Sequence, residues 1–187
     1  MLAALLVAAI IGLFPTAALA DSPSLPRGLD ASALRIPADN PSTPEKIVLG
    51  KQIFFDPRWS KSKTVSCASC HAPEHGWADP RQFSIRNDGR PTARHSPTVL
   101  NRAFSEVQQW AGARRSLEDQ ALKSSDSDPK TVVRHLGAIP AYQEQFQRVF
   151  GSGVTAENVA RRSPRSSAPS SPAMRRTTVS SPAIGRR

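Results

Sequence analysis

Apolar residues recur at helical spacing in several short segments of the chain. The first segment opens at Thr43-Pro44, where a hydroxyl cap and a proline in the first turn favour a helix start. Asp56-Pro57 ends it. The spacing predicts an amphipathic helix between these points whose apolar face is made of Ile47, Gly50, Ile53 and Phe54.

The same spacing, together with N-terminal capping residues, predicts further helices downstream. They cover about residues 66–71, 98–104, 116–123, 128–136 and 140–150, and a last one begins at Thr155. Residues 72–96 form a long polar loop, and a loop of this length inside a domain is usually functional. Because no segment alternates with period two over the length of a strand, the predicted fold class is all-α.

The N-terminal part of the chain differs from this helical region. Residues 1–20 hold an uncharged apolar run followed by Ala18-Leu19-Ala20, a pattern typical of a secretory signal peptide. The run has no Lys or Arg before it, so an uncleaved membrane anchor is the alternative. Residues 21–41 are rich in proline and are expected to form an extended lead-in. The domain itself is predicted to span residues 42–160.

From Arg161 onward the composition changes abruptly to Ser, Pro and Arg. Residues 161–187 contain seven arginines and no acidic residue, and they supply most of the formal charge of +10. The rest of the chain is only mildly basic, so a nucleic-acid partner is not expected. We interpret residues 161–187 as a basic disordered tail or, preferably, as the product of a truncated or frame-shifted gene. A helix is predicted to begin at Thr155, but the residues that follow do not supply an apolar face for it. This favours the truncated or frame-shifted gene.

The candidate chemistry is concentrated in Cys67-Ala68-Ser69-Cys70-His71. Two thiols at this spacing suit thioether bonds to one haem, and the histidine that follows suits the iron; this is the c-type haem attachment signal. A dithiol redox pair and half of a zinc site are the alternatives. The chain has only two cysteines, and no alternating strand and helix pattern surrounds them, which favours one covalent haem c. The predicted haem-binding residues are therefore Cys67, Cys70 and His71, and His71 is the predicted iron ligand.

Other motifs occur in a fixed order around this signal. They are Thr43-Pro44-Glu45-Lys46-Ile47, Phe54-Phe55-Asp56-Pro57-Arg58, Gly76-Trp77-Ala78-Asp79, Arg94-His95-Ser96-Pro97-Thr98-Val99-Leu100-Asn101, Trp110-Ala111-Gly112 and Ser116-Leu117-Glu118-Asp119-Gln120-Ala121. Together they resemble the N-terminal haem domain of bacterial dihaem cytochrome c peroxidases, over about residues 41–160. That superfamily also contains the dihaem enzyme that matures a tryptophan-derived cofactor in methylamine dehydrogenase.

The resemblance implies a cytochrome c-like haem domain with long loops, in a periplasmic oxidoreductase without a membrane span after signal cleavage. This enzyme would reduce hydrogen peroxide with electrons from a small cytochrome or copper protein. His71 would be the proximal iron ligand. Gln120 would line the peroxide pocket, and Trp110 would lie between two haems.

The sequence departs from the family pattern at three points. It holds no second Cys-x-x-Cys-His, so the haem that receives electrons is missing from it. Asn87 stands where many members carry a displaceable distal histidine. His95 occupies the position at which the family carries a calcium-binding asparagine, so a calcium site is in doubt. In addition, the family carries a glutamate of the peroxide pocket downstream of the position of Gln120, and it has no match here; the nearest acids on that side are Asp126 and Asp128.

Two other functions stay open on the sequence. One is a monohaem electron-transfer cytochrome whose iron would have a second histidine ligand, His95 or His135, since Met174 lies in the tail. The other is a fragment of a maturation-type dihaem oxidase. As local structure, His95 is expected to be structural, His75 a solvated surface residue, and His135 part of a half-exposed helix face.

Overall fold

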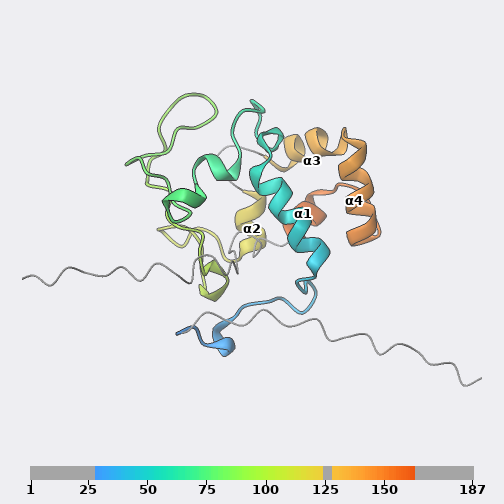
Figure 1. Ribbon diagram of the computed structural model, residues 1–187, viewed down its shortest axis with the longest axis horizontal. Coiled ribbons are helices and arrows are strands. Elements are labelled where there is room, and N and C mark those ends of the chain that lie inside the picture. The colour runs from blue at the N-terminus through green and yellow to red at the C-terminus, as the bar shows by residue number, and fades with distance from the viewer. Residues whose placement is uncertain (1–27, 124–127, 163–187) are drawn as a thin grey trace, which may run out of the picture.

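The computed structural model describes residues 28–123 and 128–162, which form a helical domain (Figure 1). Its α-helices are α1 (Pro44–Phe55), α2 (Leu117–Leu122), α3 (Pro129–Gly137), α4 (Pro140–Phe150) and α5 (Ala156–Arg161). Short 3-10 helices punctuate the loops, at Ala31–Ala33, Pro57–Trp59, Cys67–Ser69, Pro73–His75 and Arg102–Phe104. Within the described ranges only isolated β-bridges occur and no strand forms, so the all-α prediction is confirmed.

Helix α1 begins and ends where the sequence predicts. The Thr43 hydroxyl accepts a hydrogen bond from the backbone N–H of Lys46 at 3.3 Å, and Asp56 ends the helix. The predicted apolar face is wrong in one respect, because Ile47 is 38 % exposed and Leu49 is only 1 % exposed. The buried stripe of the helix is made of Lys46, Leu49, Gly50 and Ile53.

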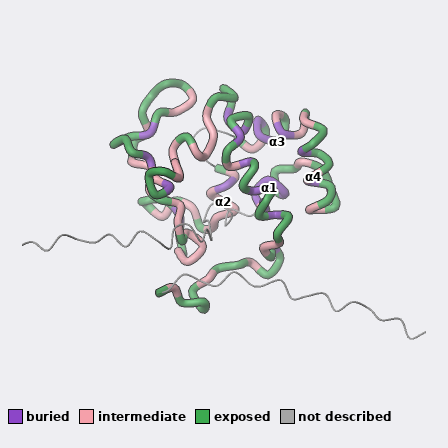
Figure 2. The backbone as a smooth tube through the Cα atoms, viewed as in Figure 1, coloured by how far each residue is buried: buried purple, intermediate pink, exposed green. Residues whose placement is uncertain are grey.

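Helices α3, α4 and α5 form one side of the core with α1. Asp128 caps α3 through the Thr131 N–H at 3.0 Å, and Thr155 caps α5 through the Asn158 N–H at 3.1 Å. Gly151, with φ of +69°, ends α4 in the left-handed conformation that glycine adopts without strain. Buried positions gather where these helices meet (Figure 2). The buried cluster consists of Leu49, Ile53, Trp59, Val132, Leu136, Tyr142, Phe146 and Val159.

Most of the long loops lie on the other side of α1 (Figure 1). The predicted loop over residues 72–96 is confirmed, apart from one 3-10 turn. The predicted helix over residues 98–104 is wrong, since only the turn Arg102–Phe104 forms. The Thr98 hydroxyl accepts the N–H of Leu100, and Asn101 takes a left-handed φ of +58°, so a continuous helix cannot start at Thr98.

Helix α5 and its C-cap residue reach residues 161 and 162, two residues past the predicted end of the domain at residue 160. Arg161 is the last residue of α5, and Arg162 is buried, with 6 % of its surface exposed. Residues 28–41 are irregular except for the turn Ala31–Ala33. The predicted signal peptide and the predicted tail beyond Arg162 lie outside the described residues. In residues 28–123 and 128–162, no helix combines the length and the apolar character needed to cross a bilayer.

Candidate haem site

The Cys-x-x-Cys-His segment is wound into a single tight turn. Ser66 opens it: its N–H donates to the Ser69 hydroxyl at 3.0 Å. The N–H of His71 then donates to the carbonyl of Cys67 at 3.0 Å. The two thiols are half-buried and are not joined by a disulfide. Burial raises the pKa of the Cys67 thiol, so the sulfur is kept in its neutral form.

Cys67, Cys70 and His71 line a common cavity of about 450 Å³. Ligand pockets in proteins commonly measure about 300–1,000 Å³. Helix α1 contributes Gly50 and Phe54 to this cavity, and α2 contributes Gln120 and Ala121. The rest of its wall comes mainly from residues 92–99 and 108–110, with Trp59 and Arg162. The last part of the long loop over residues 72–96, which was expected to be functional, therefore lines the candidate site.

The imidazole of His71 is oriented by the backbone. Its Nδ1 atom lies 3.0 Å from the carbonyl oxygen of Pro97. A carbonyl oxygen can only accept, so Nδ1 carries the proton and Nε2 carries the lone pair. Burial lowers the pKa of His71, and hydrogen bonds to Pro97 and Trp77 offset only part of this effect. A neutral imidazole with a fixed Nε2 is the form that binds a metal.

Gln120 lines this cavity and carries an acceptor that is unsatisfied in the structure. Helix α2 places it there, and Ser116 starts that helix by accepting the N–H of Asp119 at 3.0 Å. The Oε1 atom of Gln120 is buried and has no hydrogen-bond partner. A buried acceptor without a donor costs about 1–3 kcal/mol. A ligand that donates an O–H group would satisfy it.

Trp110 lies at the rim of the cavity. Its Nε1–H donates to the carbonyl of His95 at 3.0 Å, yet the residue is 66 % exposed. The preceding Gln109, with φ of +67°, and Gly112, with φ of +63°, bend this segment sharply. The bend leaves the ring of Trp110 exposed to solvent beside the candidate site. Such exposure is unusual, because tryptophan is highly buried on average.

The other three histidines differ in whether they line the cavity. His95 lines the cavity, and its Nδ1 donates to the carbonyl of Arg81 at 3.1 Å. His135 is half-buried, as expected, but it donates to the carbonyl of Arg58 at 3.1 Å and does not line the cavity. His75 is exposed, as expected. A bis-histidine arrangement within this cavity could therefore use His95 but not His135.

Of the two acidic residues named as pocket candidates, the one that the structure describes does not line the cavity. Asp128 is the N-cap of α3 and does not line it, and Asp126 lies outside the described residues. Asn87 is not among the lining residues either, although its neighbour Arg86 is. Over the described ranges, no group of three or more His, Cys, Asp or Glu side chains is arranged to hold a metal ion. The zinc alternative therefore finds no further ligands in this part of the chain.

Arg162 is a lining residue that sequence reasoning missed. Its guanidinium lies 4.0 Å from the ring centroid of Trp59, and its Nη1–H donates to the carbonyl of Val159 at 2.7 Å. Burial lowers the pKa of Arg162 to about 10. The signal that could have found it is its spacing, since Arg162 lies one helical turn after the buried Asn158 and Val159.

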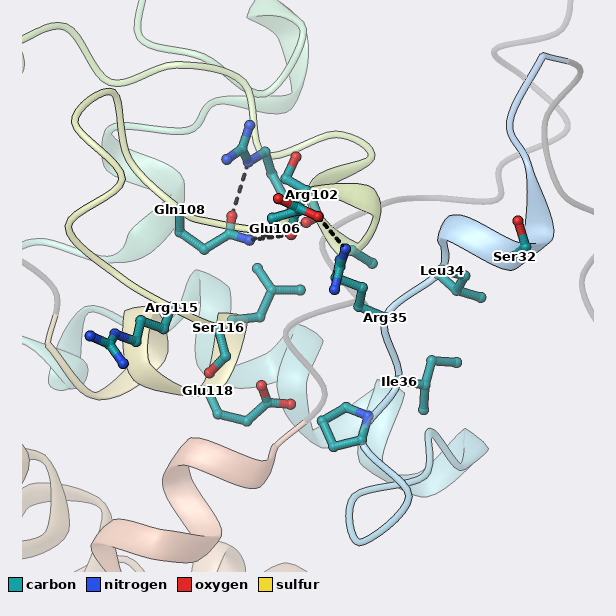
Figure 3. A pocket seen from close by; sticks show the side chains of 14 residues that line it. Ser32, Leu34, Arg35, Ile36, Arg102, Glu106, Gln108, Arg115, Ser116 and Glu118 are labelled. Atoms are coloured by element: carbon teal, nitrogen blue, oxygen red, sulfur yellow. Dashed lines mark hydrogen bonds and ion pairs between the residues drawn. The ribbon is translucent and has the colours of Figure 1, made fainter.

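Figure 3 shows a second cavity, of about 450 Å³, which shares part of its lining with the first. The lead-in forms one of its sides, and the pair Arg35–Glu106 closes across it at 2.7 Å. Arg102 and Gln108 line both cavities. The Nε–H of Arg102 donates to Oε1 of Gln108 at 3.0 Å, so this pair forms a polar part of their common wall.

The comparison with known proteins agrees with these features. The profile of the di-haem cytochrome c peroxidase family matches residues 44–162. The chain belongs to this family. The resemblance seen in the sequence is thereby confirmed, and the matched range ends at the buried Arg162.

Relatives in this family match over the same region. The methylamine utilization protein MauG of Methylorubrum extorquens is 43 % identical over 122 residues, which is 62 % of this chain and 35 % of that protein. The cytochrome c551 peroxidase of Pseudomonas aeruginosa is 36 % identical over 129 residues, 64 % of this chain and 37 % of that protein. The chain thus spans about a third of the length of these relatives.

Solved structures support the cytochrome c-like fold of the family. A MauG-like protein associated with microbial copper homeostasis superposes with a TM-score of 0.65 and 28 % identity, over 76 % of this chain and 45 % of that one. The diheme peroxidase BthA of Burkholderia thailandensis superposes with a TM-score of 0.59 over 69 % of this chain and 40 % of that one. At 18 % identity, the second match concerns the fold alone.

Proposed function

We propose that this chain carries the haem domain of a c-type peroxidase that reduces hydrogen peroxide to water. The observation that carries the proposal is one cavity wall shared by two unjoined thiols, an imidazole with a fixed Nε2, and an unsatisfied amide oxygen. Family membership adds that relatives of this region are peroxidases and MauG proteins.

The residues present fit one haem c. Cys67 and Cys70 would hold it by thioether bonds, and Nε2 of His71 would bind the iron. Phe54 and Val99 line the cavity and supply apolar contact. When bound, the haem supplies an iron centre able to exchange electrons and to accept an oxygen ligand. The protein residues supply the orientation and the hydrogen bonds.

Gln120 would orient the peroxide. Its Oε1 accepts an O–H, but an amide cannot move a proton at neutral pH. Among the described residues no carboxylate lines the cavity. His95 is the other imidazole on its wall, and histidine is the side chain that most often transfers protons in enzymes. We assign proton transfer near the bound peroxide to His95.

Electrons would come from a small cytochrome or copper protein in the periplasm. We assign the contact with such a partner, or with a second haem group, to Trp110, because it is exposed at the rim of the cavity. Since this sequence holds a single haem attachment motif, we expect only weak turnover by this chain alone. A role as part of a maturation-type oxidase is favoured by the 43 % identity to MauG.

One observation favours a second candidate function. His95 lines the same cavity as His71, so the two imidazoles could bind one iron and make the protein an electron-transfer cytochrome. The roles of His95 in the two functions exclude each other. As a sixth iron ligand it would block peroxide, and as a proton acceptor it must leave the iron open.

Absorption and electron paramagnetic resonance spectra of the ferric holoprotein test the choice. High-spin iron that binds cyanide supports the peroxidase. A low-spin spectrum that cyanide leaves unchanged, and that becomes high-spin in His95→Ala, supports the bis-histidine carrier. The matched control is His135→Ala, since His135 does not line the cavity.

A further inference from the structure

Arg162 is held rigidly inside the haem cavity. It is 6 % exposed, it stacks on Trp59 at 4.0 Å, and its Nη1–H donates to the Val159 carbonyl at 2.7 Å. An arginine on an aromatic face with one fixed hydrogen bond has lost most of its rotamer freedom. Its positive charge therefore has a defined position in the wall of the site.

No carboxylate of the described residues forms an ion pair with this guanidinium, whereas the neighbouring Arg161 pairs with Asp39 at 3.0 Å and with Glu157 at 3.1 Å. Burial lowers the pKa of Arg162 to about 10, so the guanidinium is still charged at neutral pH. Among the described residues, the nearby side chain of Cys67 favours the charged form of Arg162.

Arg162 lies near Cys67 in the cavity wall, so the cation would lie near the edge of the haem that is attached through Cys67. The thioether bonds form at the vinyl edge of the macrocycle, and the propionate carboxylates extend from the opposite edge. The haem carboxylates would therefore not neutralise Arg162. The guanidinium would act on the iron as an uncompensated charge in a site of low dielectric constant.

We propose that Arg162 is a fixed buried cation that raises the reduction potential of the haem. This inference rests on the proposed haem site. Ferric haem carries one more positive charge than ferrous haem, so a nearby cation disfavours the ferric state. Arg162 is a positioning residue in this role, since it acts on the iron electrostatically and binds no substrate.

The test is a spectroelectrochemical titration of the holoprotein. Arg162→Met and Arg162→Gln remove the charge, Arg162→Lys keeps it, and Arg161→Gln is the control. At the wild-type midpoint we expect the two neutral variants to show at least a tenfold higher ratio of ferric to ferrous haem. For a one-electron couple this ratio corresponds to a midpoint lowered by about 59 mV. Arg162→Lys and Arg161→Gln should stay near the wild-type midpoint.

The outcomes separate the two proposals. Absence of covalent haem from the wild-type chain, seen by haem staining, would overturn the haem site and this inference with it. Haem present with an unchanged midpoint in both neutral variants would overturn the inference alone. An equal fall in Arg162→Lys, or loss of haem from both neutral variants while Arg162→Lys retains it, would make the role structural and would also overturn it.

Discussion

The Nδ1 atom of His71 donates to the carbonyl oxygen of Pro97, 3.0 Å away and 26 residues further along the chain. The long loop between them thus closes back on the candidate iron ligand and fixes its tautomer. The loop is itself pinned near its end, where the hydroxyls of Ser84 and Ser96 lie 2.6 Å apart. The orientation of His71 therefore depends on a loop that no periodic pattern describes.

Substituting His71 should separate ligation from attachment. We expect His71→Ala to keep haem bound through Cys67 and Cys70 while the iron loses its imidazole ligand. The absorption spectrum of the ferric protein measures the change, and His75→Ala is the control because His75 is exposed. An axial spectrum identical to that of the wild type in His71→Ala would refute the assignment.

Substituting Gln120 should improve stability and impair reactivity. Gln120→Leu removes a buried acceptor that has no partner, so the free energy of unfolding should rise by about 1 kcal/mol in the absence of peroxide. The rate of reaction of the ferric protein with peroxide should fall about tenfold, which corresponds to about 1.4 kcal/mol. Urea unfolding and stopped-flow absorption measure the two effects. In Gln52→Leu, a change of an exposed glutamine, neither should occur.

The Tyr142 hydroxyl ties α4 to the end of α1. It donates to Oδ2 of Asp56 at 2.7 Å, and both residues are buried. Burial and the carboxylate of Asp56 raise the pKa of Tyr142, so the phenol stays protonated. Tyr142→Phe should lower the free energy of unfolding by about 1.5–3 kcal/mol, the contribution of a hydrogen bond to a charged group. An unchanged urea midpoint would contradict the role given to this pair.

Acid should destabilise the domain through Asp79. Hydrogen bonds from Arg81 hold the pKa of this carboxyl well below its usual range, although burial opposes the shift. Because the folded-state pKa is lowered, the stabilisation is present above the ordinary value of about 3.9 and is lost as the pH falls below it. Urea unfolding at neutral pH and near pH 3 should show this fall, and the fall should be smaller in Asp79→Asn.

The pair Asp88–Arg90 is a matched control for Asp79–Arg81. Both pairs join a carboxylate to an arginine two residues later, at 2.6 Å and 2.7 Å. The side chain of Asp88 is 35 % exposed and that of Asp79 is 0 % exposed. Asp88→Asn should therefore change the pH dependence of stability less than Asp79→Asn does, because solvent screens exposed ion pairs. An equal change in the two variants would show that burial does not set the effect.

Local signals predicted most of the helices. The hydroxyl caps of Thr43, Ser116 and Thr155 each accept the N–H three residues later, and each helix starts where its cap stands. Helix faces were harder to predict, since Ile47 and Leu49 are both apolar and only tertiary packing decides that Leu49 is the buried one. The helix expected at Thr98 does not form for a different, local reason. The hydroxyl of Thr98 accepts a hydrogen bond from the backbone two residues later.

The candidate site was predictable in its chemistry but not in its contacts. The attachment signal alone names Cys67, Cys70 and His71. The partner of His71 is a backbone carbonyl, which carries no sequence signal. Arg162 was not predicted as a lining residue, because the composition after residue 160 suggests a solvated tail. In the structure Arg162 is the C-cap of α5, and its side chain packs on Trp59.

The most direct test of the account is covalent haem on this chain. The protein should be produced with export in cells that mature c-type cytochromes, and then denatured and stained for haem. We expect one haem per chain to survive denaturation, and none to survive in the double variant Cys67→Ala, Cys70→Ala. A colourless wild-type product, or zinc bound in place of iron, would contradict the central claim.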